Sequence, residues 1–89
     1  MNAIKIEVMS QHYMGPLTVE PVYKDNSLFS VYLNEELLGR AQPVKKQDKI
    51  QWYSHQIKDK ELLEQIGEWI EHLFPLTDKS FKPVYGFNW

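Results

Sequence analysis

The chain has 89 residues, of which 43% are hydrophobic and 25% are charged, a composition typical of a single soluble globular domain. Ten basic residues against twelve acidic ones give a formal net charge of -2, so no global basic excess attracts nucleic acid or an anionic membrane. Cysteine is absent, which excludes a disulfide framework, a thiolate metal site and a cysteine nucleophile.

The N-terminal part of the chain carries two strand-like segments. Residues 4–9 alternate apolar and polar side chains with the two-residue period of a half-buried strand. Gly15-Pro16 predicts a break and a turn, and residues 17–23 form a second candidate strand. Because Pro21 removes a donor from the ladder, we expect this second strand to lie at an edge of the sheet or to be kinked there.

A tight hairpin is the clearest feature of the middle of the chain. We interpret residues 28–33 and 37–44 as its strands and residues 34–36 as its loop. If all three loop residues stay outside the ladder, two apolar pairs face each other: Leu33 with Leu37, and Phe29 with Ala41. A two-residue loop would shift this register, and the sequence leaves that alternative open.

Two residues interrupt the second strand of this hairpin. Gly39 indicates a bulge or the close approach of another element, and Pro43 predicts the end of the pairing. Residues 45–49 then predict a charged turn, and residues 50–54 a short last strand.

Residues 59–74 show the strongest periodicity in the chain and predict one amphipathic helix. Its apolar residues recur at spacings of three and four: Leu62, Leu63, Ile66, Trp69, Ile70, Leu73 and Phe74. Asp59 is the expected N-cap, and Pro75 ends the helix. Glycine inside a helix costs about 1 kcal/mol relative to alanine. We therefore expect Gly67, together with Gly39, to mark the closest approach of helix and sheet.

A series of strands followed by a single helix predicts an α+β fold, with residues 1–89 forming one domain. We expect an antiparallel meander of four or five strands within residues 4–54, one helix packed on one sheet face, and an extended aromatic tail over residues 75–89. The open face of the sheet would then offer apolar side chains to the tail or to a partner: Leu28, Tyr32, Leu38, Val44 and Tyr53.

The residue types that commonly perform catalysis or hold metals are scattered along the chain. His12, His55 and His72 belong to three different elements and show no metal-ligand spacing. The serines stand in no recognisable nucleophile motif, and the four glycines form no phosphate-binding loop. We therefore predict no catalytic residue, no metal site and no cofactor. A small hydrolase or metal protein that uses His12 or His55 ranks third among our hypotheses.

The lengths of the apolar segments also indicate where in the cell the protein is expected. Charges at Lys5 and Glu7 interrupt the apolar stretch that a signal peptide needs. No apolar run approaches the ~18 residues of a transmembrane helix. We therefore expect a cytoplasmic protein that does not enter a membrane.

The leading functional hypothesis is a non-catalytic protein-interaction module. Four aromatic residues lie near the C-terminus: Phe81, Tyr85, Phe87 and Trp89. Such a segment is too apolar for a free disordered end, so we expect its rings to be buried against protein. Either the tail folds back onto its own sheet, or it docks on another subunit as an added strand. The second arrangement makes a homodimer the expected assembly.

The second hypothesis is binding of single-stranded nucleic acid. Its motif is a basic stretch interleaved with aromatic side chains: Lys45, Lys46, Lys49, Trp52 and Tyr53. Lysines around one turn are also common in solvated loops that protect a strand edge. Trp52 shares a strand face with Ile50, which favours a place in the core. Nucleic-acid binding therefore stays second to protein binding.

Overall fold

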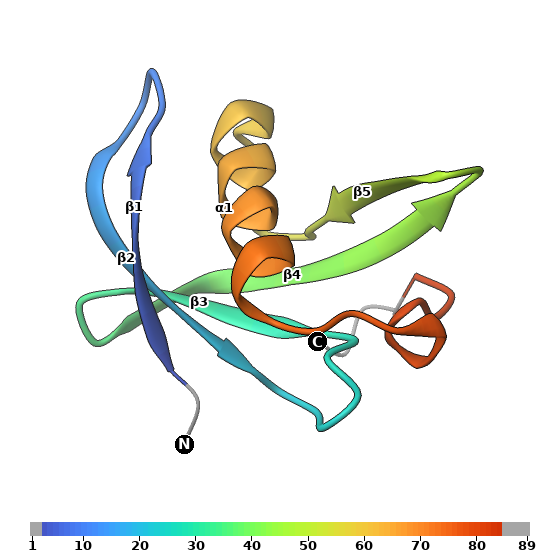
Figure 1. Cartoon of the computed structure of the whole chain (residues 1–89). Coiled ribbons are helices and arrows are strands. Elements are labelled where there is room, and N and C mark those ends of the chain that lie inside the picture. Colours follow the sequence, from blue (N-terminus) through green and yellow to red (C-terminus); the bar gives the residue numbers. More distant parts are fainter. Residues whose placement is uncertain (1–2, 85–89) are drawn as a thin grey trace.

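In the computed structural model, which describes residues 3–84, five antiparallel strands precede one helix (Figure 1). The strands pair in chain order: β1 (Ile4–Met9), β2 (Met14–Pro21), β3 (Phe29–Leu33), β4 (Glu36–Lys46) and β5 (Lys49–Tyr53). The helix α1 spans Lys60–Leu73, and a short 3-10 turn follows at Asp78–Ser80. The predicted α+β meander with a C-terminal helix is confirmed, with five strands rather than four.

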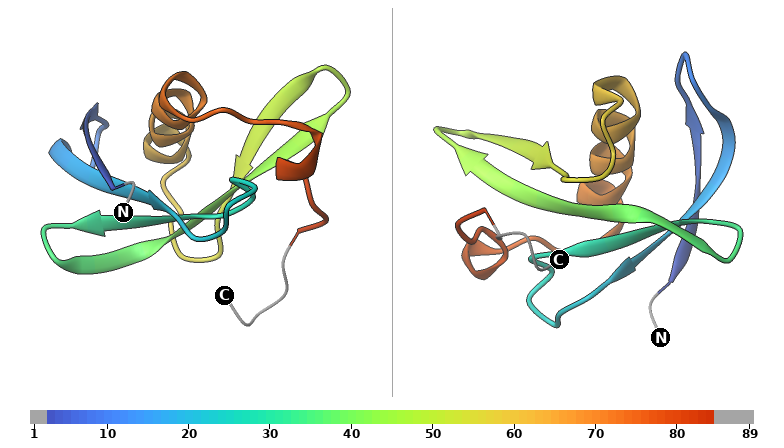
Figure 2. Two further views of the ribbon diagram at one scale, coloured as in Figure 1. Left: turned by 60° about the horizontal axis from the view of Figure 1, so that its bottom comes forward. Right: turned by 180° about the vertical axis from the view of Figure 1, so that it is seen from behind.

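The sheet curls around the helix (Figures 1 and 2). The long strand β4 pairs with β3 through its first half and with β5 through its second half. As a result, β1 and β2 rise on one side of α1, and the β4–β5 hairpin projects on the other. The helix packs against β1, β4 and β5, so each of its flanks faces one edge strand of the sheet.

The core lies between α1 and the sheet face that the helix covers. The sheet contributes the buried side chains of Ile6, Val8, Leu17, Val19, Phe29, Val31 and Ala41. The helix contributes Leu62, Leu63, Ile66 and Ile70, and Phe74 follows at its end. This confirms most of the predicted apolar stripe. Trp69 is the exception, because it is 37% exposed and uses its indole N–H at the edge of the sheet.

Both ends of the helix agree with the expected signals. The Asp59 side chain accepts a hydrogen bond from the Leu62 backbone N–H at 3.2 Å, which satisfies one of the free donors of the first turn. At the other end, the Phe74 N–H donates to the Ile70 carbonyl at 2.8 Å, and Pro75 follows.

The β3–β4 loop corrects the predicted register. The loop has two residues, Asn34 and Glu35, and Leu33 pairs with Glu36 rather than with Leu37. Asn34 supplies the positive φ of 57° that so short a hairpin turn requires.

A β-bulge restores the expected pairing farther from the loop. The pairs on either side of the irregularity are Val31–Gly39 and Tyr32–Leu37, which leaves Leu38 as the extra residue. Phe29 therefore faces Ala41, as predicted. Leu38 packs against the core instead of the open face, and Leu28 is also buried. The open face is thus less apolar than expected.

The turn predicted at Gly15-Pro16 and the edge position predicted from Pro21 were wrong. Gly15-Pro16 lies inside β2, and the preceding turn is closed where the Ser10 N–H donates to the Tyr13 carbonyl at 2.8 Å. The strand β2 is also central rather than an edge. Pro21 is tolerated there because it lies beyond the last described β1–β2 pair, so its missing N–H interrupts no bond to β1.

Pro43 does not end the pairing either. It lies within β4, opposite Trp52, and the ladder continues to the Lys46–Lys49 pair. A proline is compatible with an antiparallel ladder when its nitrogen faces away from the partner strand, which is the case at a non-hydrogen-bonded pair.

The two glycines mark two different close approaches. At Gly67, an added Cβ would collide with the Trp52 ring, so this glycine does lie where helix and sheet meet, as predicted. At Gly39, an added Cβ would lie 2.7 Å from the Gln56 Cβ, in the connection between β5 and α1. The prediction for Gly39 was therefore wrong about the helix, although a close approach exists.

The described part of the tail, through Val84, folds back onto the domain. The Ser80 hydroxyl donates to the Asp25 carbonyl at 2.6 Å, and Lys82 forms an ion pair with Asp25 at 3.4 Å. The buried Gln42 amide donates to the carbonyls of Lys82 and Pro83. Three of the predicted tail aromatics, Tyr85, Phe87 and Trp89, lie outside the described residues.

Candidate interaction site at the edges of the sheet

The outer edge of β1 is bonded by side chains of α1. Three helix residues reach this edge and the turn after it: Trp69 to Glu7, Gln65 to Met9, and Glu61 to Gln11. The Gln65 amide accepts from the Met9 N–H at 2.7 Å and also donates to the Met9 carbonyl. One side-chain amide thus takes the place of the peptide group of a neighbouring strand.

The helix side chains can bond successive outward residues of β1 because the spacing along a helix is close to the spacing along a strand. The three helix residues follow each other at intervals of four, which advances about 6 Å along a helix. Their partners follow at intervals of two, about 6.6 Å along a strand. A row of helix side chains can therefore follow alternate residues of a strand, and it protects β1 from pairing with another chain.

No described residue covers the outer edge of β5 in this way. Within residues 3–84, β5 pairs with β4 alone, and no side chain bonds the main chain of Ile50 or Trp52. Because Pro43 cannot donate, its pair with Trp52 is of the non-hydrogen-bonded kind. The alternation of an antiparallel ladder then directs the N–H and C=O groups of Ile50 and Trp52 away from β4.

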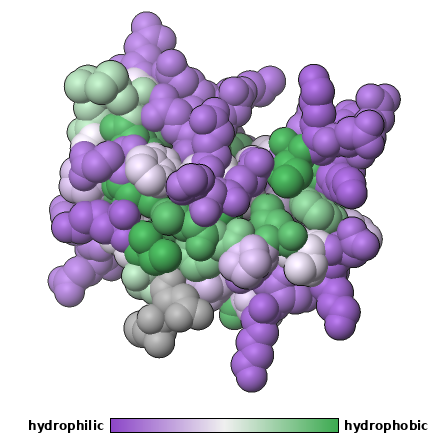
Figure 3. All heavy atoms as spheres, in the orientation of Figure 1, coloured by the Kyte–Doolittle hydropathy of each residue, from purple (hydrophilic) through white to green (hydrophobic). Residues whose placement is uncertain are grey.

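A groove of about 620 Å³ separates this edge from the helix. Its apolar lining comes from Ile50, Trp52, Ile57 and Leu63, and its charged lining from Lys58, Lys60, Glu64, Glu68 and Glu71. In Figure 3 the surface is hollowed between the body of the molecule and the projecting β4–β5 hairpin. The volume lies within the roughly 300 to 1,000 Å³ of ligand-binding clefts.

Trp52 is fixed in the wall of this groove. Its ring lies edge-on to Phe29 at a centroid distance of 6.0 Å and against the backbone of Gly67. Its indole N–H donates to Glu71 at 2.8 Å. Trp52, one of the two aromatic residues of the predicted nucleic-acid site, is therefore a half-buried packing residue.

The other residues of the predicted nucleic-acid site lie apart from the Trp52 ring. Lys45, Lys46 and Lys49 are exposed near the tip of the β4–β5 hairpin. Tyr53 follows Trp52 in β5, so its ring points to the opposite sheet face, where it meets His55 edge-on at 5.2 Å. The structure thus pairs Lys46 with Lys49, whereas Lys45 pairs with Ile50 on the opposite sheet face, so the five residues do not form one surface.

Among the predicted partner-binding aromatics, Phe81 alone belongs to the described residues. It is half-buried, and the Lys45 ammonium lies 5.8 Å from its ring centroid. Phe81 therefore packs on the β4–β5 hairpin of its own chain.

His12 joins a cluster that resembles a catalytic triad in composition only. Its Nδ1 lies 3.0 Å from Asp59 Oδ2, and the Ser10 hydroxyl donates to the same oxygen at 3.2 Å. In a nucleophilic triad the serine bonds the imidazole instead. The pKa of Asp59 is lowered, chiefly by the hydrogen bond from the Leu62 N–H and further by His12 and Ser10. The cluster ties the β1–β2 turn to the start of the helix.

The His12 ring lies beside Asp59, and the His55 ring contacts Tyr53. In the described part of the chain, no group of three or more histidine, aspartate or glutamate side chains is arranged to hold a metal ion.

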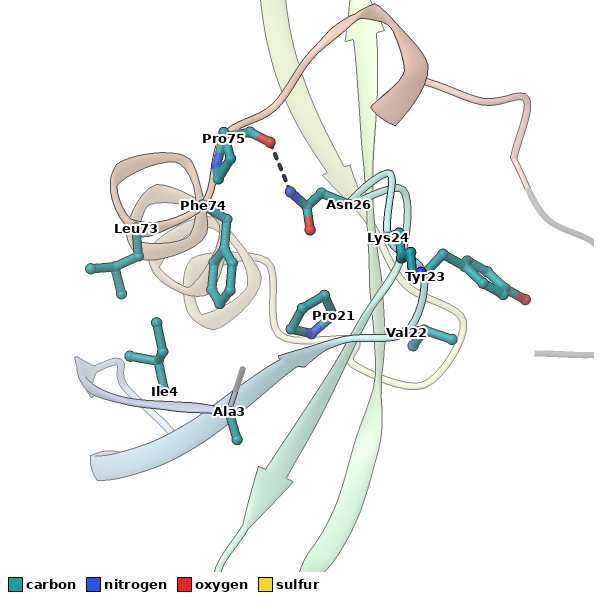
Figure 4. A pocket seen from close by; sticks show the side chains of 10 residues that line it. All are labelled: Ala3, Ile4, Pro21, Val22, Tyr23, Lys24, Asn26, Leu73, Phe74 and Pro75. Carbon is teal, nitrogen blue, oxygen red and sulfur yellow. Dashed lines mark hydrogen bonds between the residues drawn. The ribbon is translucent and has the colours of Figure 1, made fainter. Parts of the chain in front are cut away.

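A second depression, of about 690 Å³, lies where the end of α1 meets the β2–β3 loop (Figure 4). Its lining is mostly apolar, and the Asn26 amide closes one side by donating to the Pro75 carbonyl at 2.8 Å. Ala3, the first described residue, also lines it. We assign it no role.

Comparisons with protein families, with curated proteins and with solved structures find no match to this chain. Within residues 3–84 no helix is long and apolar enough to cross a membrane. The function is therefore argued from the geometry above. The amphipathic pattern of α1 does not indicate this site, because it does not divide the polar residues into the two rows that lie beside β1 and beside the groove.

Proposed function

We propose that this protein is a non-catalytic interaction module that takes an extended segment of another polypeptide chain as an added strand on the outer edge of β5. The observation that carries the proposal is the contrast between the two edges of the sheet. Helix side chains bond the edge of β1, whereas the outward main-chain groups of β5 face a groove.

Strand addition uses the groups that this edge offers. In known complexes of this kind, main-chain hydrogen bonds supply affinity and pockets for alternate side chains supply specificity. Ile50 and Trp52 present donors and acceptors, and the apolar lining beside them can bury every second side chain of an incoming segment. A second copy of this chain is one possible donor of the segment, which keeps the expected homodimer within the proposal.

The test begins with phage-displayed random peptides selected on the immobilised full chain. Enriched peptides are then synthesised and added to isotopically labelled protein, and amide exchange is followed by NMR. We expect the Ile50 and Trp52 amides to become protected on binding, while the Gln51 amide, which already faces β4, changes little. Protection confined to other regions, or no enriched peptide and no self-association, would overturn the proposal.

A pair of variants tests the edge itself. Ile50→Pro removes an outward donor, and Ile50→Val keeps it with a similar side chain. We expect proline to weaken peptide binding at least about tenfold, which corresponds to the loss of a hydrogen bond of about 1.4 kcal/mol, and valine to leave it within about twofold. If the full chain sediments as a dimer, Ile50→Pro should dissociate it. Should the proline variant fail to fold, amide exchange in the native chain still decides the question.

A further inference from the structure

We infer that the segment bound at β5 carries lysine or arginine at alternate positions, and that Glu64 and Glu68 of α1 recognise them. This inference rests on the proposed function, and it names the chemistry of the partner. It comes from the charge, the spacing and the apolar lining of the helix wall opposite β5.

The helix wall of the groove is acidic on balance, because Glu64, Glu68 and Glu71 outnumber Lys60, and Lys58 lies just before the helix. Glu64 and Glu68 are exposed and line the groove, and neither forms an ion pair within residues 3–84. They are four positions apart on the helix, where like charges repel each other. A cation held between them would relieve that repulsion as well as form new contacts.

The spacing of the two glutamates suits an extended chain. Side chains four residues apart on a helix are separated by about 6 Å, and alternate residues of a strand by about 6.6 Å. The other flank of the same helix shows this agreement of spacings, because Gln65 and Trp69 form hydrogen bonds to Met9 and Glu7. Glu64 and Glu68 repeat this interval of four on the flank that faces the groove.

The apolar lining favours long cationic side chains. Trp52 and Leu63 lie in the groove below the glutamates, and a lysine or arginine can lay its methylene stem on such a surface while its charged end remains in water. A second copy of this chain is a poorer occupant. Two-fold pairing of β5 strands would bring two acidic rows to the same junction, where they repel each other.

The closing experiment compares two capped peptides of equal length on the full chain: alternating lysine–valine and alternating glutamate–valine. We expect the lysine peptide to protect the Ile50 and Trp52 amides and to bind at least about tenfold more tightly than the glutamate peptide. Its binding should weaken as salt is added, because exposed charges are screened.

Variants then assign the charge effect to the helix. Glu64→Gln and Glu68→Gln should each weaken binding of the lysine peptide by about two- to fivefold, the range of an exposed ion pair. Glu35→Gln makes the same change of net charge in the β3–β4 loop and should leave binding unchanged. Glutamine is a good helix former, so these helix variants should fold.

The outcomes separate this inference from the function on which it rests. Equal affinity of the two peptides, with protection at β5, would overturn the recognition of basic residues and leave strand addition intact. Lysine-peptide binding that does not protect β5, or that Glu64→Gln and Glu68→Gln do not weaken, would also overturn the inference. Failure of every peptide to engage β5, or dimerisation through β5 that excludes the lysine peptide, would remove the inference.

Discussion

Position 67 has room only for glycine, because the ring of Trp52 lies against the helix backbone there. The same ring contacts Phe29 in the core and bonds Glu71 on the helix surface. This one contact therefore sets how closely β5 approaches α1, and with it the width of the groove between them.

The substitution Gly67→Ala distinguishes packing from helix propensity. Propensity alone predicts that alanine stabilises the helix by about 1 kcal/mol. Because the new Cβ would collide with Trp52, we instead expect the free energy of unfolding to fall by about 1 to 3 kcal/mol, the usual cost of overpacking. Chemical denaturation measures the difference.

Glu68→Ala is the matched control, since it introduces the same residue one position along on the exposed side of the helix. It should change stability by less than about 0.5 kcal/mol. A Gly67→Ala variant more stable than the native chain would show that Trp52 does not restrict the helix.

Sequence and structure agree at Gly67 but not at Gly39, and the reason is physical. The helical pattern shows which side of α1 is buried, so a glycine within that stripe already implies close packing. The neighbour of Gly39 is Gln56, which lies in an irregular connection. No periodicity describes the path of such a segment, so the sequence indicated a close approach without its partner.

At the level of elements, α1 has two roles that its amphipathic pattern does not separate. Its buried residues hold the core, as the sequence predicted. Its polar residues divide into a row beside β1, which contains Gln65, and a row beside the groove, which contains Glu64. Periodicity shows which residues avoid the core, whereas the strands that flank them depend on how the sheet curls. The candidate site was therefore not predictable from the helix alone.

Gln65→Ala tests the protection of β1. The variant removes an acceptor for the Met9 N–H and a donor for the Met9 carbonyl. We expect a loss of about 1 kcal/mol in unfolding free energy, since these bonds are exposed, and faster exchange of the Met9 amide. Sedimentation should also show association at high concentration, because an uncovered edge strand can pair with another chain.

Gln65→Glu provides the matched control because it keeps an acceptor but loses the donor. The Met9 amide should remain slower to exchange in this variant than in Gln65→Ala. Equal exchange rates in the native chain and in Gln65→Ala would contradict the assigned role of the glutamine.

On the scale of the whole molecule, the meander was predictable because each strand is adjacent in the chain to its partner. The curl was not, because it arises where β4 changes partner from β3 to β5 within one continuous strand. The alternation of side chains is the same before and after that change. Yet the curl is what places both edge strands beside a single helix, so that one edge is covered and the other faces a groove.

The tail offers a test at this scale, because residues 77–83 join the β2–β3 loop to β4. The fully buried Gln42 amide donates to two tail carbonyls, and Asp25 holds both Ser80 and Lys82. A chain ending at Pro75 loses all of these contacts, whereas a chain ending at Val84 keeps them. We expect the shorter chain to be about 1 to 3 kcal/mol less stable, because it loses several tail hydrogen bonds that contribute about 1 kcal/mol each.

Thermal unfolding of the two truncated chains measures the effect, at about 4 to 8 °C for each kcal/mol in a domain of this size. Light scattering of the same samples addresses the predicted homodimer. If Tyr85, Phe87 and Trp89 link two subunits, the full chain should scatter as a dimer and the chain ending at Val84 as a monomer. Their melting temperatures should be similar. Equal melting temperatures for the chains ending at Pro75 and Val84 would instead show that the described tail contacts do not stabilise the domain.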